Sequence, residues 1–110
     1  MITIVLDIIK PQVLVTNAVI NTIKESKSHT LLCVQDGYVQ FESKMTFWDW
    51  GCLFDLYIQP TALNSVRLTL RGKLKYGIDI FDFARKRGKE ALTLCIQSMN
   101  LMQNQYRYIC

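Results

Sequence analysis

The sequence contains one histidine, His29, and its four cysteines are scattered without a Cys-x-x-Cys pair. Structural zinc sites need closely spaced cysteine and histidine ligands, so this spacing disfavours a metal site. A hydrolytic triad would have to use His29 as its base, and a histidine at the start of a predicted strand is more typical of an exposed surface position. We therefore predict a domain without a catalytic residue, a metal ion or a cofactor.

Phosphate-binding loops and long apolar runs are also missing. Gly72 and Gly77 flank a basic connection, but they lack the Gly-Lys-Ser/Thr ending and the strand-to-helix context of a phosphate-binding loop. No apolar run approaches the roughly 20 residues that cross a bilayer. The apolar stretch 2–9 contains Asp7, and no small-residue cleavage pattern follows it, which favours a strand over a signal peptide. These absences predict a cytoplasmic protein with reduced cysteines and no membrane segment.

The composition is that of a folded domain. Half of the 110 residues are hydrophobic and 20% are charged, which argues against disorder. The length fits one α+β domain spanning residues 1–110. The net charge is +4, and much of the basic excess lies in one third of the chain. This basic segment contains Arg67, Arg71, Lys73, Lys75, Arg85, Lys86, Arg87 and Lys89. It suits a solvated face, with an anion-facing edge as the alternative.

Hydrophobic periodicity divides the chain into strands and helices. Alternating apolar residues predict strands over residues 2–9, 29–34, 38–45, 52–59 and 66–71. Helical spacing predicts helices over residues 12–25 and 82–103. The order β-α-β-β-β-β-α predicts an α+β fold with an antiparallel five-stranded sheet. In this fold the first strand joins beside the last, and both helices pack on one face.

The last third of the chain leaves three local questions. Asp79 and Asp82 could pair as acids, but at a helix start they more simply cap exposed amides. Gly88 lowers helix propensity by about 1 kcal/mol relative to alanine, which predicts an irregular start or a kink. The tail 104–110 shows no periodicity, so both fraying and docking stay open.

Both tryptophans lie in the segment 45–51, which separates two predicted strands. Tryptophan and phenylalanine bury large areas, and glycine lets the backbone bend at positive φ. We predict a structural corner formed by Phe47, Trp48, Trp50 and Gly51. A buried Trp50 would cost about 3–5 kcal/mol of stability when replaced by alanine. The alternative is an aromatic patch at the edge of a binding surface.

The segment Trp48-Asp49-Trp50-Gly51 resembles the Phe-x-Trp-Gly element that opens a strand in small bacterial proteins of the START-like, helix-grip type. Residues 82–86, with the sequence Asp-Phe-Ala-Arg-Lys, stand where that family has an Asp-Trp-Gly-Lys-Asn-like element. They differ from it at Phe83, Ala84 and Lys86. The order of elements matches over nearly the whole chain. The resemblance implies a helix-grip fold, like that of the TATA-binding protein, and no catalytic residue is carried over from it.

The resemblance also implies capture of an apolar ligand between the last helix and the sheet. Met99 and Met102 would line one wall, and Phe41, Phe54 and Leu68 the other. The alternative is that these residues simply fill one another's space. We predict a non-enzymatic domain that binds a small apolar ligand or a protein partner.

A basic nucleic-acid binder is the alternative function. The open sheet face would offer stacking rings and cations to a single strand. These side chains are Tyr38, Tyr57, Arg67, Thr69 and Arg71. Glu42 and Asp55 share that face, which disfavours nucleic acid.

The sequence also predicts self-association. The parity of Val5, Ile9, Leu32, Val34 and Leu53 places apolar side chains on the face away from the helices. A homodimer paired through this face or through the edge strand would cover them.

Overall fold

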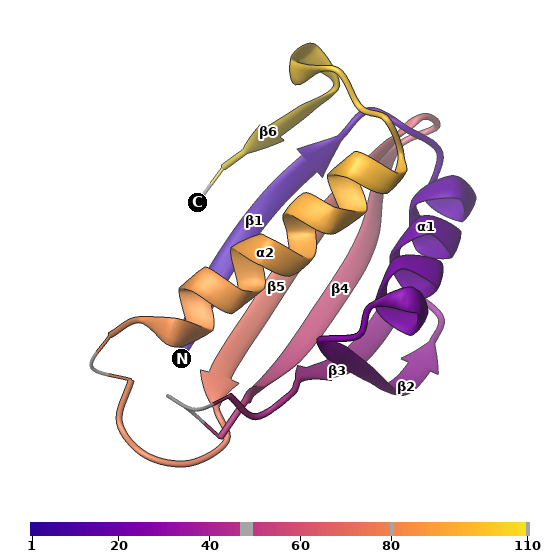
Figure 1. Cartoon of the computed structure of the whole chain (residues 1–110). Coiled ribbons are helices and arrows are strands. Elements are labelled where there is room, and N and C mark those ends of the chain that lie inside the picture. Colours follow the sequence, from indigo (N-terminus) through magenta and orange to yellow (C-terminus); the bar gives the residue numbers. More distant parts are fainter. Residues whose placement is uncertain (47–49, 80, 110) are drawn as a thin grey trace.

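The computed structural model describes residues 1–46, 50–79 and 81–109, in which two helices lie on one face of an antiparallel sheet (Figure 1). The elements are β1 (Ile2–Ile8), α1 (Gln12–Glu25), β2 (His29–Gln35), β3 (Tyr38–Ser43), β4 (Cys52–Ala62), β5 (Ser65–Leu74), α2 (Phe83–Ser98), the 3-10 turn η1 (Gln103–Gln105) and β6 (Tyr106–Tyr108). The strand order is β2-β3-β4-β5-β1-β6. The predicted α+β helix-grip fold is confirmed, with a sixth strand in addition.

Strands β2 to β5 form a meander, and β1 pairs with β5 as predicted. The register places Leu6 opposite Leu68 and Ile4 opposite Leu70, so apolar side chains from the first and fifth strands share the covered face. The β2–β3 hairpin turns through Gly37, whose φ of 72° lies in the region that suits glycine. None of the helices in the described part of the chain is long and apolar enough to span a bilayer.

The core lies between the inner face of the sheet and the two helices. Phe41 and Phe54 stack at its centre with ring centroids 5.1 Å apart. Helix α2 lies close to the sheet at Gly88, where an added Cβ would be 2.9 Å from Leu70 Cδ2. Burying apolar surface contributes about 25 cal/mol per Å², so this dense layer is the main source of stability. The fully buried side chains include Ile4, Leu6, Ile8, Val15, Val19, Ile23, Leu56, Leu68 and Leu92.

Asp79 caps the start of helix α2 as predicted, whereas Asp82 makes no side-chain cap hydrogen bond and pairs with Arg85 instead, and the helix ends earlier than predicted. Asp79 accepts hydrogen bonds from the backbone N–H groups of Phe83 (2.6 Å) and Ala84 (2.9 Å). The helix ends at Ser98 rather than at residue 103. Asn100 then reverses the chain with φ of 53°, an αL conformation that asparagine tolerates.

Strand β2 forms one edge of the sheet and contains a bulge. The register shifts between Leu31 and Cys33, so Leu32 is the extra residue. Val34 consequently pairs with Val39 and lies on the helix-covered side. This corrects the prediction that Leu32 and Val34 both point away from the helices. Because a bulge also hinders edge-to-edge pairing, the homodimer, which stays a prediction, would have to form through the outer sheet face.

The predicted aromatic corner is only partly packed. Phe47 and Trp48 lie outside the described residues. Gly51 is buried with φ of 94°, and an added Cβ there would be 2.4 Å from the carbonyl oxygen of Ser43. Trp50 is 61% exposed, and its ring makes an edge-to-face contact with the ring of Tyr76, with centroids 6.2 Å apart. The prediction that Trp50 is buried is therefore wrong.

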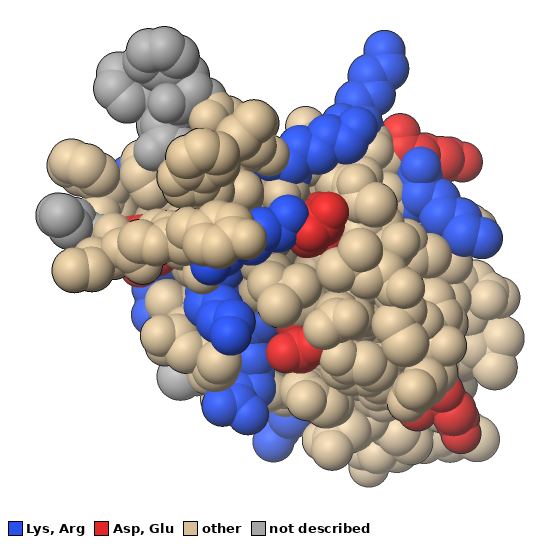
Figure 2. All heavy atoms as spheres, turned by 90° about the horizontal axis from the view of Figure 1, so that it is seen from below, with Lys and Arg blue, Asp and Glu red and all other residues tan. Residues whose placement is uncertain are grey.

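The lower end of the molecule, where β5 ends and α2 begins, carries much of the basic segment. Figure 2 views this end and shows Lys and Arg side chains interrupted by single acidic groups. Four cations of the basic segment form ion pairs within the described part of the chain: Arg67 with Asp7, Lys75 with Glu42, Arg85 with Asp82, and Arg87 with Glu90. Pairs this exposed contribute little to stability, so the segment forms a solvated and partly neutralised surface.

Candidate functional site

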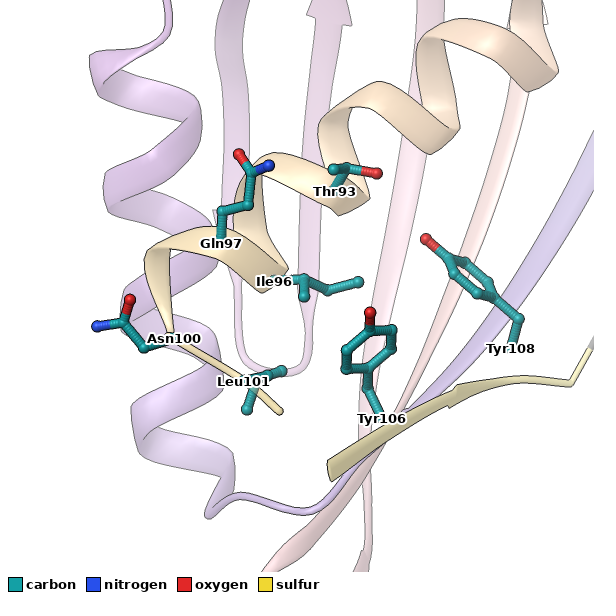
Figure 3. A pocket seen from close by; sticks show the side chains of 7 residues that line it. All are labelled: Thr93, Ile96, Gln97, Asn100, Leu101, Tyr106 and Tyr108. Atoms are coloured by element: carbon teal, nitrogen blue, oxygen red, sulfur yellow. The ribbon is translucent and has the colours of Figure 1, made fainter. Parts of the chain in front are cut away.

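A groove of about 620 Å³ runs between the C-terminal half of α2 and strand β6 (Figure 3). It is lined by Thr93, Ile96, Gln97, Asn100, Leu101, Tyr106 and Tyr108. These residues come from the last two turns of α2, from the reversal that follows, and from the docked tail. The tail therefore docks rather than frays, and this docking forms one wall of the groove.

The local structure explains why these side chains converge. Thr93, Ile96 and Gln97 are three and four residues apart, so they share one face of the helix. Tyr106 and Tyr108 are two residues apart on β6, so both rings point to the same side of the strand. The strand is held against β1 by backbone hydrogen bonds at both ends, from Ile9 to Gln105 and from Ile109 to Val5, each 2.8 Å.

The groove combines an apolar base with polar groups. Ile96 is buried, and Leu101 packs against the core. The hydroxyl groups of Tyr106 and Tyr108 point toward α2 (Figure 3). Two flat rings beside aliphatic side chains suit a small amphipathic molecule with a ring of its own, because aromatic rings stack and hydroxyls orient polar groups.

Tyr108 has a raised pKa in the groove. Partial burial raises the pKa of its hydroxyl, and a hydrogen bond with Thr93 acts in the opposite direction. The ammonium group of Lys89 lies 5.7 Å from the ring centroid, within cation–π range. Tyr108 is therefore a neutral hydroxyl near pH 7 that can donate or accept a hydrogen bond.

The residues predicted to bind a ligand lie at two separate places. Phe41, Phe54 and Leu68 are fully buried in the core. Met99 packs against the edge of the core, whereas Met102 is 69% exposed and precedes η1. Ligand binding by these five residues together stays a prediction.

Sequence reasoning missed the groove itself. Within α2, Leu92 and Ile96 are buried and Leu94 is exposed, so Ile96 supplies the apolar part of the helical wall. The alternation of Tyr106 and Tyr108 was the available signal for its second wall. A three-residue strand is too short for periodicity to identify with certainty.

His29 is also not where the sequence suggested. It was predicted to be exposed, but only 6% of its surface is accessible. It pairs with Ser43 on the helix-covered face of the sheet, and its ring meets Phe41 edge-on with centroids 5.8 Å apart. The predicted strand does begin at His29, but a strand start was taken to be exposed, whereas pairing with the buried Ser43 directs the side chain of His29 inward.

Several polar and aromatic side chains on the open face of the sheet already contact one another. Arg67 donates two hydrogen bonds to Asp7, at 2.8 and 3.0 Å. Tyr38 donates to Asp55, and this bond raises the pKa of Tyr38 to about 12. The ring of Tyr38 lies against that of Tyr57 at 5.3 Å. A nucleic acid would have to compete with these contacts, which weakens the alternative function.

No model of a known protein family and no curated protein sequence matches this chain. Among solved structures, it resembles the di-domain ARO/CYC protein StfQ from the steffimycin biosynthetic pathway, with a TM-score of 0.57 and 9% sequence identity. The match covers 89% of this chain and 44% of StfQ, so the chain spans less than half the length of that protein. At this identity the likeness shows the fold alone, and it agrees with the helix-grip resemblance of the sequence.

This finding corrects the prediction of a non-enzymatic domain. That prediction rested on the absence of a recognisable catalytic motif, whereas the same fold is found in an ARO/CYC protein of a biosynthetic pathway.

Proposed function

We propose that this domain binds a small amphipathic molecule with a ring system in the groove between α2 and β6. The main support for this proposal is the position of Tyr106 and Tyr108, which face the helical residue Ile96 across a groove of about 620 Å³. A volume of this order lies in the range of small-molecule sites, roughly 300–1,000 Å³. The structural likeness to StfQ supports small-molecule binding and names no ligand for this chain.

The geometry indicates how such a molecule would be held. A flat ring would pack on Tyr106 and against Ile96, removing apolar surface from water. Its polar substituents would meet the hydroxyl of Tyr108 and the amide of Gln97 at the rim. Because the groove is open on one side, part of the ligand would stay in contact with water.

The direct test is native mass spectrometry of freshly purified protein, which reports a co-purified molecule by its mass. The second test uses the fluorescent probe 8-anilinonaphthalene-1-sulfonate, an amphipathic ring compound. Thr93→Trp fills the groove and is expected to weaken probe binding at least about tenfold, the effect of losing roughly 1.4 kcal/mol. Thr93 is exposed, so this variant is expected to fold.

Thr30→Trp is the matched control. Thr30 is also an exposed threonine, but it lies on β2 opposite Glu42, outside the groove. The control is expected to bind the probe like the wild type. Equal probe affinity in Thr93→Trp and Thr30→Trp would contradict the proposal.

A further inference from the structure

A second hollow, of about 210 Å³, lies on the other side of α2 beside His29. Its walls come from the α1–β2 turn, the segment that leaves β3, and the first half of α2. It is lined by Lys27, Ser28, His29, Ser43, Lys44, Met45, Thr46, Arg87 and Glu90. It shares no lining residue with the groove between α2 and β6, so the two sites are independent.

The charges around this hollow are unbalanced. Lys27, Lys44 and Arg87 contribute three cations, and Glu90 contributes one anion. The Arg87 side chain is 24% exposed, and its Nη1 atom lies 3.4 Å from Oε1 of Glu90, whose side chain is 60% exposed. Charges near a low-dielectric wall interact more strongly than charges in bulk water. The local excess of positive charge therefore favours an anion.

His29, which is only 6% exposed, lies at the inner end of the hollow. The Ser26 oxygen accepts a hydrogen bond from the backbone N–H of Ser28 (3.2 Å) and lies 2.7 Å from His29 Nδ1. With its oxygen accepting from Ser28, the Ser26 hydroxyl can donate to Nδ1. In the tautomer in which Ser26 donates to Nδ1, the neutral ring carries its proton on Nε2, which is then a hydrogen-bond donor.

We propose that this hollow binds a small oxyanion, a phosphate or a carboxylate group, through Arg87 and Lys44 with His29 at its inner end. Arg87 offers the planar fork of donors that matches both groups. A water molecule occupies about 30 Å³ in the liquid, so the hollow has room for roughly seven waters, or for one such anion with several waters. Glu90 opposes binding, and its exposed carboxylate can turn toward solvent.

His29 can report anion binding by NMR without interference from other imidazoles, because it is the only histidine in the sequence. Its imidazole protons give one set of NMR signals, which can be followed while the protein is titrated with sodium phosphate and, separately, with sodium acetate at constant ionic strength. The expected result is a saturating shift with at least one of the two anions. The anion that binds more tightly identifies the preferred group.

The variants Arg87→Met and Lys44→Met are expected to weaken binding at least about tenfold, because each removes a charge-assisted contact. Lys24→Met is the control: Lys24 is exposed on α1, and its loss changes the net charge equally. Lys44 is also exposed, so that variant tests the site even if Arg87→Met does not fold. A shift that is linear in both anions, or a saturating shift unaffected by Lys44→Met, would overturn the proposal.

Discussion

Gly72 lies directly under the ring of Phe54: an added Cβ at Gly72 would be 2.5 Å from both Cδ1 and Cε1 of that ring. The two residues are register partners on β5 and β4. The aromatic ring thus covers the glycine and compensates for its missing side chain. This contact explains how a glycine is accommodated inside a central strand of the sheet.

The first prediction follows from this contact. Gly72→Ala is expected to lower the free energy of unfolding by about 1–3 kcal/mol, the usual cost of inserting a methyl group into a packed core. Chemical denaturation provides the measurement. In a Phe54→Leu background, Gly72→Ala is expected to cost less, because the rigid ring is gone. If Gly72→Ala lowered the free energy of unfolding equally in both backgrounds, the ring of Phe54 would not be what crowds position 72.

The second prediction compares an exposed aromatic residue, Trp50, with a buried one, Phe41. Trp50→Ala is expected to change the free energy of unfolding by less than about 1 kcal/mol, because Trp50 is largely exposed. Phe41→Ala is expected to cost about 3–5 kcal/mol, because Phe41 is buried and stacked. The denaturation midpoints of both variants test this difference. A large loss with Trp50→Ala would show that it packs against something outside the described residues.

Much of the fold was predictable because its strands alternate strictly. Leu56 and Ile58 on β4, and Leu68 and Leu70 on β5, all point inward as their parity required. The Asp36-Gly37 pair, a dipeptide typical of tight hairpin turns, lies between β2 and β3. With four hairpin-linked strands and one crossover helix, few topologies remain.

The predictions failed where one residue changes the parity or ends an element. The bulge at Leu32 reverses the faces of the rest of β2, and no local pattern signals it. Met102 was assigned to the helix because its spacing fits, although Asn100 had already reversed the chain. The groove depends on both the end of α2 and the docking of the tail, and tertiary pairing with β1 decides this docking.

The third prediction uses the pH dependence of stability. Burial lowers the pKa of His29, Arg87 lowers it further, and Glu90 acts in the opposite direction. The unfolded chain therefore binds a proton below about pH 6.5 that the folded protein does not bind. Stability is expected to fall as the pH decreases from 7.5 through 6.5. Urea denaturation at several pH values measures the free energy of unfolding of the wild type and of His29→Gln. Between pH 7.5 and 6.5 this free energy is expected to change less with pH in the variant than in the wild type.

The fourth prediction concerns the thiols. Burial raises the pKa of Cys95 to about 12, and Cys52 is also buried, so neither is expected to react in the folded protein. Cys33 is only half-buried and is free in the structure. A Cys33→Ser, Cys110→Ser double variant is expected to react with a thiol reagent only after unfolding. Rapid reaction of the folded double variant would show that the core opens at Cys52 or Cys95.

The last prediction tests whether the groove depends on the docked tail. The hydrogen bonds from Ile9 to Gln105 and from Ile109 to Val5 place the intervening N–H of Arg107 on the side that faces β1. Proline has no N–H, so Arg107→Pro is expected to undock β6, whereas Arg107→Ala keeps the pairing. Three register positions join β6 to β1, so the global denaturation midpoint is expected to change little.

Two measurements distinguish local undocking from general damage. Amide exchange at Ile9 and Ile109 is expected to become fast in Arg107→Pro and to stay slow in Arg107→Ala, because only proline breaks the pairing. Affinity for 8-anilinonaphthalene-1-sulfonate is expected to fall with proline alone, since Tyr106 and Tyr108 would leave the groove. If the proline variant exchanged quickly and still bound the probe normally, the binding site would have to lie elsewhere on the fold. Joint loss of protection and of affinity would show that the tail forms the second wall of the site.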